Sequence, residues 1–99
     1  MIRHIVMWRI EDKQEGNKLD VATQIKQVLS ELPSLIDEII TFEVGINEVS
    51  SSRAADVVLQ SSFKSYADLE SYRVHPEHQR VAQYIQSVVA ESWVVDYTI

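Results

Sequence analysis

The sequence predicts an α+β protein of the ferredoxin-like class, with the order β-α-β-β-α-β and a four-stranded antiparallel sheet. Runs of β-rich, partly alternating residues lie near both ends of the 99-residue chain and twice in its middle. Apolar residues spaced three or four apart separate the first run from the second and the third from the fourth. Because only two glycines and two prolines interrupt the chain, there is little room for a linker, and one domain over residues 1–99 is expected.

Residues 2–10 form the first predicted strand. One face carries Ile2, His4, Val6, Trp8 and Ile10, and the other carries Arg3, Ile5, Met7 and Arg9. Large apolar residues on both faces indicate that both are covered. Helices can cover only one face of such a sheet, so the second face is expected to pack against the sheet of another copy. We therefore expect a homodimer.

The next elements are a helix and a pair of strands. Apolar residues spaced three or four apart predict a helix over residues 18–32, which Pro33 ends. These apolar positions are Leu19, Ala22, Ile25, Val28, Leu29 and Leu32. Strands are predicted over residues 39–44, before Gly45, and over residues 56–63. The polar residues 48–53 join them and, with residues 11–17, are the segments expected to be mobile.

Two helices and a strand complete the chain. Ser65 and Asp68 have the spacing of a capping box, which predicts a short helix over residues 66–72. Pro76 can open a further helix, with Glu77 near the positive end of its dipole. Its buried stripe would be Val81, Tyr84, Ile85 and Val88, and residues 93–99 would form the last strand.

Composition excludes several classes of function. Nine Lys and Arg against fifteen Asp and Glu give a net charge of −6, which disfavours nucleic-acid binding. The absence of cysteine excludes disulfides, thiolate zinc sites and a cysteine nucleophile. Arg3, His4 and Arg9 interrupt the apolar start, so no signal peptide or membrane span is predicted there, and we expect a cytoplasmic protein without membrane contact.

Histidines are the main candidates for chemistry. If Pro76 is the first helical residue, His78 is the third, and the positive helix end would keep its imidazole neutral and able to accept a proton. Alternatively, His75 only caps the helix and His78 lies half exposed. His4 could be a hydrogen-bonded core residue or a catalyst, and Tyr72 a core residue with a bonded hydroxyl. No carboxylate shares the helical spacing of His75 and His78, so we expect no metal site. No Gly-rich phosphate loop or dinucleotide fingerprint is present, so we expect no cofactor.

Several segments resemble the stress-responsive dimeric α/β-barrel (Dabb) family. They are IRHIVMWR at residues 2–9, GIN at 45–47, FKSYADL at 63–69, YRVHPEH at 72–78 and VVDY at 94–97. The His-Pro-x-His segment is the most specific of them. The resemblance implies the ferredoxin-like fold, with two protomers packed sheet on sheet into a dimeric α/β barrel, and it assigns no reaction to most family members.

One branch of this family contains plant polyketide cyclases, which perform aldol ring closure without cofactor or metal. By resemblance, His78 would be the base, helped by Tyr72, with His4 nearby. The pocket would be lined by Val6, Trp8, Ile25, Val28 and Leu29. In the plant cyclases a further tyrosine from the first helix contributes to the substrate pocket, and its position falls near Ile25 in this chain. Because this tyrosine is missing here, we do not expect the plant substrate. Some plant members bind magnesium at the dimer, but no acidic cluster here places such a site.

Three functions stay open at this point. The chain could be a homodimeric binding or accessory protein with a small apolar pocket for an apolar or aromatic carbonyl ligand. It could be a cofactor-independent enzyme on a carbonyl or polyketide-like substrate, of the aldol cyclase or isomerase type. It could also be a structural barrel with a filled pocket. A void on which His4, Tyr72 and His78 converge would favour the first two functions.

Overall fold

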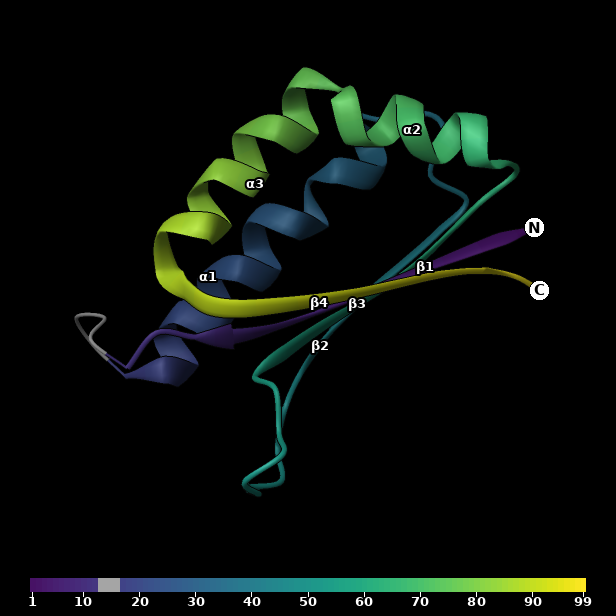
Figure 1. Ribbon diagram of the computed structural model, residues 1–99. Coiled ribbons are helices and arrows are strands. Elements are labelled where there is room, and N and C mark those ends of the chain that lie inside the picture. Colours follow the sequence, from purple (N-terminus) through teal and green to yellow (C-terminus); the bar gives the residue numbers. More distant parts are fainter. Residues whose placement is uncertain (13–16) are drawn as a thin grey trace.

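The computed structural model describes residues 1–12 and 17–99. Its four strands form one antiparallel sheet in the order β2-β3-β1-β4, and the helices lie on one face of it (Figure 1). This confirms the predicted ferredoxin-like plan, with the second helical segment divided at His75. The elements are β1 Ile2–Ile10, α1 Lys18–Ser30, the short 3₁₀ helix η1 Leu32–Ser34, β2 Thr41–Ile46, β3 Val57–Phe63, α2 Tyr66–Val74, α3 Pro76–Val88 and β4 Val89–Thr98.

The starts of two strands differ from the prediction by more than one residue. β4 begins at Val89 rather than at residue 93, because α3 passes directly into extended backbone there and Val89 pairs with Ile10. β2 begins at Thr41 rather than at residue 39, since Ile36 is buried in the core and Ile39 donates its N–H to the Ile36 carbonyl at 3.4 Å. The chain therefore turns before it enters the sheet.

The core lies between the sheet and the helices. Ile2, His4, Trp8 and Ile10 of β1 are buried on this side, as their alternation predicts. The fully or nearly fully buried residues from the other elements include Ile25, Leu29, Leu32, Leu59, Phe63, Tyr72, Val81 and Ile85. Burying this apolar surface is the main stabilising contribution to the fold.

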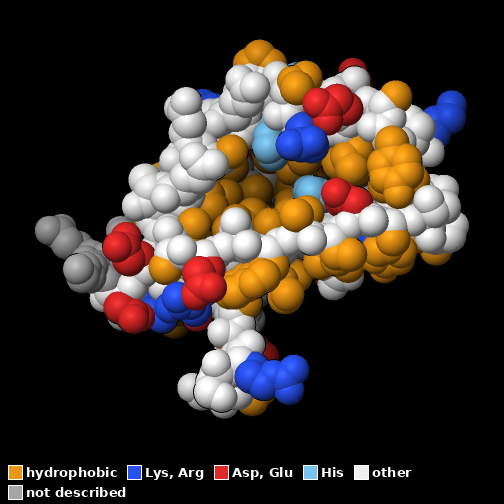
Figure 2. Space-filling view, viewed as in Figure 1, with side chains coloured by type: hydrophobic (Ala, Val, Ile, Leu, Met, Phe, Trp, Pro, Cys, Tyr) orange, Lys and Arg blue, Asp and Glu red, His pale blue; other side chains and the backbone are white. Residues whose placement is uncertain are grey.

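The other face of the sheet is exposed and apolar in this protomer. Register places Ile5 beside Val95 and Met7 beside Trp93, all on the face opposite to His4. Met7, Trp93 and Val95 are 42, 44 and 53% exposed, and Figure 2 shows hydrophobic side chains along this side of β4. A patch of this kind is typical of an interaction surface.

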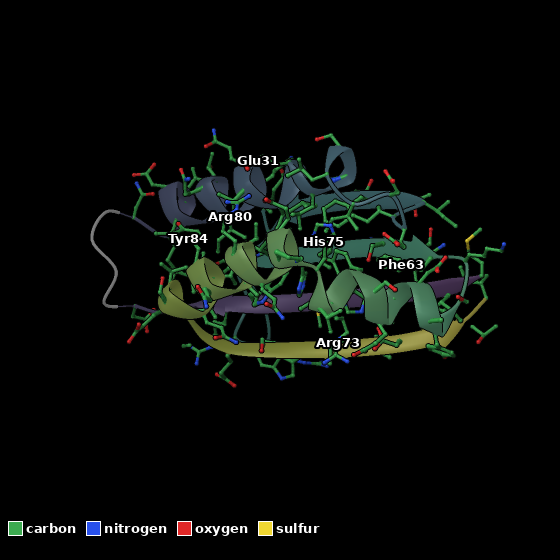
Figure 3. All side chains as sticks on the ribbon, turned by 90° about the horizontal axis from the view of Figure 1, so that it is seen from above. Glu31, Phe63, Arg73, His75, Arg80 and Tyr84 are labelled. Atoms are coloured by element: carbon green, nitrogen blue, oxygen red, sulfur yellow. The ribbon has the colours of Figure 1, made fainter. Side chains whose placement is uncertain are left out.

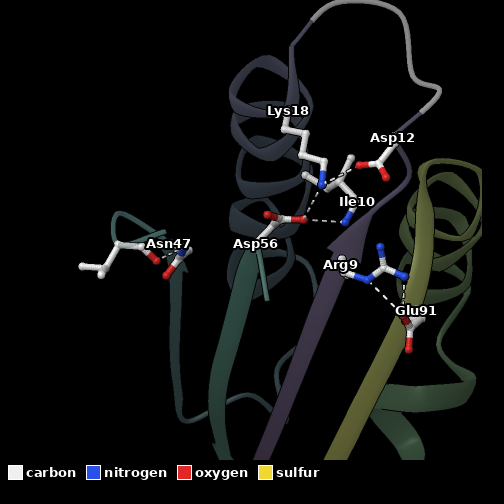
Figure 4. Close-up of polar contacts among 8 residues, drawn as sticks. Arg9, Ile10, Asp12, Lys18, Asn47, Asp56 and Glu91 are labelled. Atoms are coloured by element: carbon white, nitrogen blue, oxygen red, sulfur yellow. Dashed lines mark hydrogen bonds and ion pairs between the residues drawn. The ribbon is translucent and has the colours of Figure 1, made fainter. Parts of the chain in front are cut away.

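Polar contacts fix the end of β1 (Figure 4). The Ile10 N–H donates to the Asp56 carboxylate at 2.7 Å, and Lys18 lies 3.8 Å from that carboxylate and 2.9 Å from Asp12. Residues 13–16 of the first expected mobile segment lie outside the described residues, and the mobility of residues 48–53 stays a prediction. In the described ranges, no helix is long and apolar enough to cross a membrane.

Candidate active site between the sheet and the helices

A cavity of about 330 Å³ lies between the sheet and the helices. Figure 2 shows it as a hollow between the helices and β4, with apolar walls and histidines beside it. His4, Tyr72 and His78 all line this cavity. The three side chains therefore meet at an open pocket and not at a filled core. The lining residues are His4, Val6, Trp8, Leu29, Leu59, Tyr72, Arg73, His78, Val81, Ala82, Ile85, Gln86, Val89 and Ser92.

The turn between α2 and α3 fixes the position of His78. His75 caps α3, because its Nδ1 accepts the N–H of Glu77 at 3.1 Å, and Pro76 is the first helical residue. The His78 Nδ1 lies 3.0 Å from the Arg73 carbonyl oxygen. A carbonyl can only accept, so Nδ1 carries the hydrogen, and in the neutral ring Nε2 is the nitrogen that can take a proton.

The surroundings of His78 favour its neutral form. Burial is the largest cause that lowers the pKa of His78, the hydrogen bond to the Arg73 carbonyl acts in the opposite direction, and the electrostatic influence of the neighbouring His4, Arg73 and His75 lowers the pKa further. The sequence predicts a neutral His78 from the helix dipole. Desolvation is the largest cause in the structure, so the neutral state depends on the half-buried position of the ring.

Tyr72 lies between His78 and two side chains of the sheet, Phe63 and His4. Its ring centroid is 4.4 Å from that of His78, 5.0 Å from that of Phe63 and 6.1 Å from that of His4. Tyr72 is only 1% exposed, and this burial raises the pKa of its hydroxyl well above the usual range. No hydrogen bond of that hydroxyl is found within residues 1–12 and 17–99, so it can donate to a molecule in the cavity.

His4 forms a pair with Asp96. The two residues are directly opposite each other in the β1–β4 ladder, and the Nδ1 of His4 is bonded to the Asp96 carboxylate. A carboxylate oxygen accepts, so this bond sets the orientation of the buried ring and places a hydrogen on Nδ1. Nε2 of His4 remains for contact with a ligand.

His4, Tyr72 and His78 lie together at one end of the cavity, and Ser92 is level with Trp8 at the other. His4 lies level with Asp96, next to Tyr72, whereas Val6 lies level with Leu59, and Trp8 lies two residues further along β1. From His4 to Trp8, the rise of a strand corresponds to roughly 13 Å. The cavity therefore suits a molecule with a polar head and a mainly apolar body, which could carry a further polar group beside Ser92.

Comparisons with known proteins assign the family. The model of the Stress responsive A/B Barrel Domain, Dabb, matches residues 2–99. The chain belongs to the Dabb family. Two proteins of Arabidopsis thaliana, both named as stress-response A/B barrel domain-containing proteins, are 28% and 27% identical over 97% and 98% of the chain. The chain spans only 37% and 46% of their lengths, less than half of each.

Solved structures show the Dabb fold in other proteins. A dimeric ferredoxin-like protein of unknown function from Bacteroides fragilis has a TM-score of 0.87 and 28% identity, covering 99% of this chain and 95% of its own. A hydroxynitrile lyase from Passiflora edulis has a TM-score of 0.83 at 20% identity, covering 99% of this chain and 92% of its own. At that identity, the second similarity shows the fold alone.

In this Dabb chain, most of the residues predicted to line a pocket do so. Val6, Trp8 and Leu29 line the cavity. Ile25 does not, because it is completely buried in the core, and Val28 lies partly buried against the core instead. In the described part of the chain, no group of three or more His, Asp or Glu residues could hold a metal ion.

Sequence reasoning missed two groups at the site of the Dabb chain. The alternation of the last strand puts Asp96 on one face with Val94 and Thr98, but only the antiparallel register shows that it meets His4. Arg73 was missed because a basic residue in the last turn of a helix is ordinarily solvated. A search for charged residues opposite or near the histidines would have found both.

Proposed function

We propose that this chain is a cofactor-independent enzyme that removes a proton from the carbon next to a carbonyl group. The observation that carries the proposal is the convergence of His4, Tyr72 and His78 on one otherwise largely apolar cavity. An apolar pocket with a few convergent polar groups is the usual form of a small-molecule site. The volume of about 330 Å³ supports a small substrate.

His78 is the base in this proposal. Its Nε2 takes the proton of the C–H bond, and the electron pair of that bond moves into an enolate. The hydrogen bond from Nδ1 to the Arg73 carbonyl keeps the ring in the tautomer that this step needs. The lowered pKa of His78 keeps the base neutral near pH 7.

Tyr72 and His4 hold the oxygen on which charge develops. The Tyr72 hydroxyl stays protonated because burial raises its pKa, and it donates to the carbonyl oxygen. Asp96 keeps the His4 ring oriented beside Tyr72. In an aldol cyclisation the enolate carbon then attacks a second carbonyl of the substrate, whereas in an isomerisation another carbon takes the proton back.

Exchange of carbon-bound hydrogen tests this proposal without knowledge of the natural substrate. Benzylacetone has a carbonyl head and an aromatic body, and nuclear magnetic resonance in deuterium oxide follows its exchange. We expect catalysed exchange that falls by about a hundredfold or more in His78→Ala. His75→Asn is the matched control, since asparagine also caps helices. Binding without exchange in the unmodified protein would instead identify a ligand-binding protein.

We also propose that two copies pair through the helix-free face of the sheet. The exposed apolar side chains of Met7, Trp93 and Val95 on this face support the pairing. Two structural neighbours, from Bacteroides fragilis and Thermobifida fusca, are described as dimeric. Light scattering at micromolar concentration should give the mass of a dimer, and a monomeric mass would contradict this proposal.

A further inference from the structure

We infer that the substrate of this cavity carries a carboxylate as well as a carbonyl, and that Arg73 binds this carboxylate at the mouth. The inference rests on the proposed function for the carbonyl and adds the substrate class, which is a small oxo acid with an apolar body. Arg73 is then a specificity-determining residue.

Arg73 is the only permanently charged residue in the cavity lining, among the residues that the structure describes. The chain has only nine basic residues and a net charge of −6, so this cation does not belong to a generally basic surface. A cation at the mouth of a largely apolar cavity, paired among the described residues only with the exposed carboxylate of Glu70, would attract an anionic group of a ligand.

The position of Arg73 suits contact with a molecule bound in the cavity. It lies in the last turn of α2, on the side that faces β4 (Figure 3). It lines both the cavity and an outer groove, and His78 lines both as well. Figure 2 shows a basic group at the rim of the hollow, next to a histidine. A carboxylate held there would lie close to His78.

The guanidinium of Arg73 can exchange its present partner. Its Nη1 donates to the Glu70 carboxylate at 3.1 Å, and the two side chains are 61 and 60% exposed. Such exposed pairs contribute little stability, so a substrate can displace Glu70 easily. Within residues 1–12 and 17–99, the guanidinium has no other acceptor. Its parallel N–H groups match a planar carboxylate.

Other acidic groups do not occupy this position. Glu70 lines only the outer groove, and Asp96 lines neither the cavity nor that groove and is bonded to His4. A substrate carboxylate beside Arg73 therefore has one carboxylate to displace. Since Arg73 is the only cation in the described lining, a single negative charge fits better than the double charge of a phosphate.

Calorimetric binding of a matched pair of probes tests the inference. β-Benzoylpropionate and its amide have the same shape and differ in charge. We expect the unmodified protein to bind the acid at least about tenfold more tightly than the amide. Arg73→Gln should remove this preference and leave the affinity for the amide unchanged. Glu70→Gln should strengthen binding of the acid, because it removes the competing carboxylate.

Arg80→Gln is the matched control. Arg80 is also exposed and paired with glutamates, but it does not line the cavity, so its loss changes the net charge equally and should leave the preference intact. The inference would be overturned if the unmodified protein bound the acid and the amide with equal affinity. It would also be overturned if neither probe bound at millimolar concentration. An equal loss of both probes in Arg73→Gln would also overturn it. His78→Ala should keep the preference for the acid over the amide, because His78 is the proposed base and does not bind the carboxylate. The role of Arg73 can therefore be tested even if the proposed catalysis fails.

Discussion

Replacing Tyr72 by phenylalanine separates the catalytic contribution of this residue from its structural one. The ring is buried against Phe63 and His78, and phenylalanine keeps those contacts. The hydroxyl has no bonding partner in the described ranges, so its removal should cost less than about 0.5 kcal/mol, below what a typical hydrogen bond contributes. Loss of a donor to the enolate oxygen should lower the exchange rate by about 10²–10³-fold. Removal of the whole ring in Tyr72→Ala should cost about 3–5 kcal/mol.

Two measurements check this separation. Urea unfolding gives the free energy of unfolding of each variant, and deuterium exchange of benzylacetone gives its rate. Tyr66→Phe is the matched control, because Tyr66 begins the same helix and is exposed away from the cavity. A loss of stability above about 1 kcal/mol in Tyr72→Phe would mean that the hydroxyl is bonded within the protein. An unchanged exchange rate would refute its role as a donor.

Three further predictions concern the interface, the His4 pair and pH. Met7→Glu should convert the dimer to a monomer in light scattering, because it places a charge at the centre of the proposed interface. Asp96→Asn should lower the exchange rate by at least about tenfold with the fold intact by circular dichroism, since the orienting carboxylate of His4 is lost. The lowered pKa of His78 places the acid limb of the exchange rate below pH 6.5. As the pH falls below 6.5, His78 takes up a proton more readily in the unfolded chain than in the folded protein. The free energy of unfolding should therefore decrease as the pH falls, and it should decrease less in His78→Gln.

The fold could be predicted because local signals agree with the final packing. Ser65 accepts the N–H of Asp68 at 3.2 Å, as its capping spacing predicts, and Pro76 begins α3. The alternation of β1 correctly assigns its buried face. The early start of β4 was not predictable, because residues 89–92 form part of an exposed edge strand and show no apolar alternation.

The site was only partly predictable, because it depends on how distant elements meet. The helix position of His78 follows from Pro76, but the burial that lowers its pKa comes from packing. The pairing of Asp96 with His4 depends on the register of strands at opposite ends of the chain. Helix periodicity places Ile25 and Leu29 on one stripe, and only the rotation of α1 against the sheet decides that Leu29 reaches the cavity.

Hydrogen exchange of benzylacetone in deuterium oxide is the sharpest test of whether His78 is a general base in a carbonyl-binding cavity. If His78 is the base, the exchange rate rises with pH through the lowered pKa of His78 and falls by about a hundredfold or more in His78→Ala. His75→Asn should exchange at the unmodified rate. Equal exchange rates in His78→Ala and the unmodified protein, with the fold intact, would show that His78 is not the base.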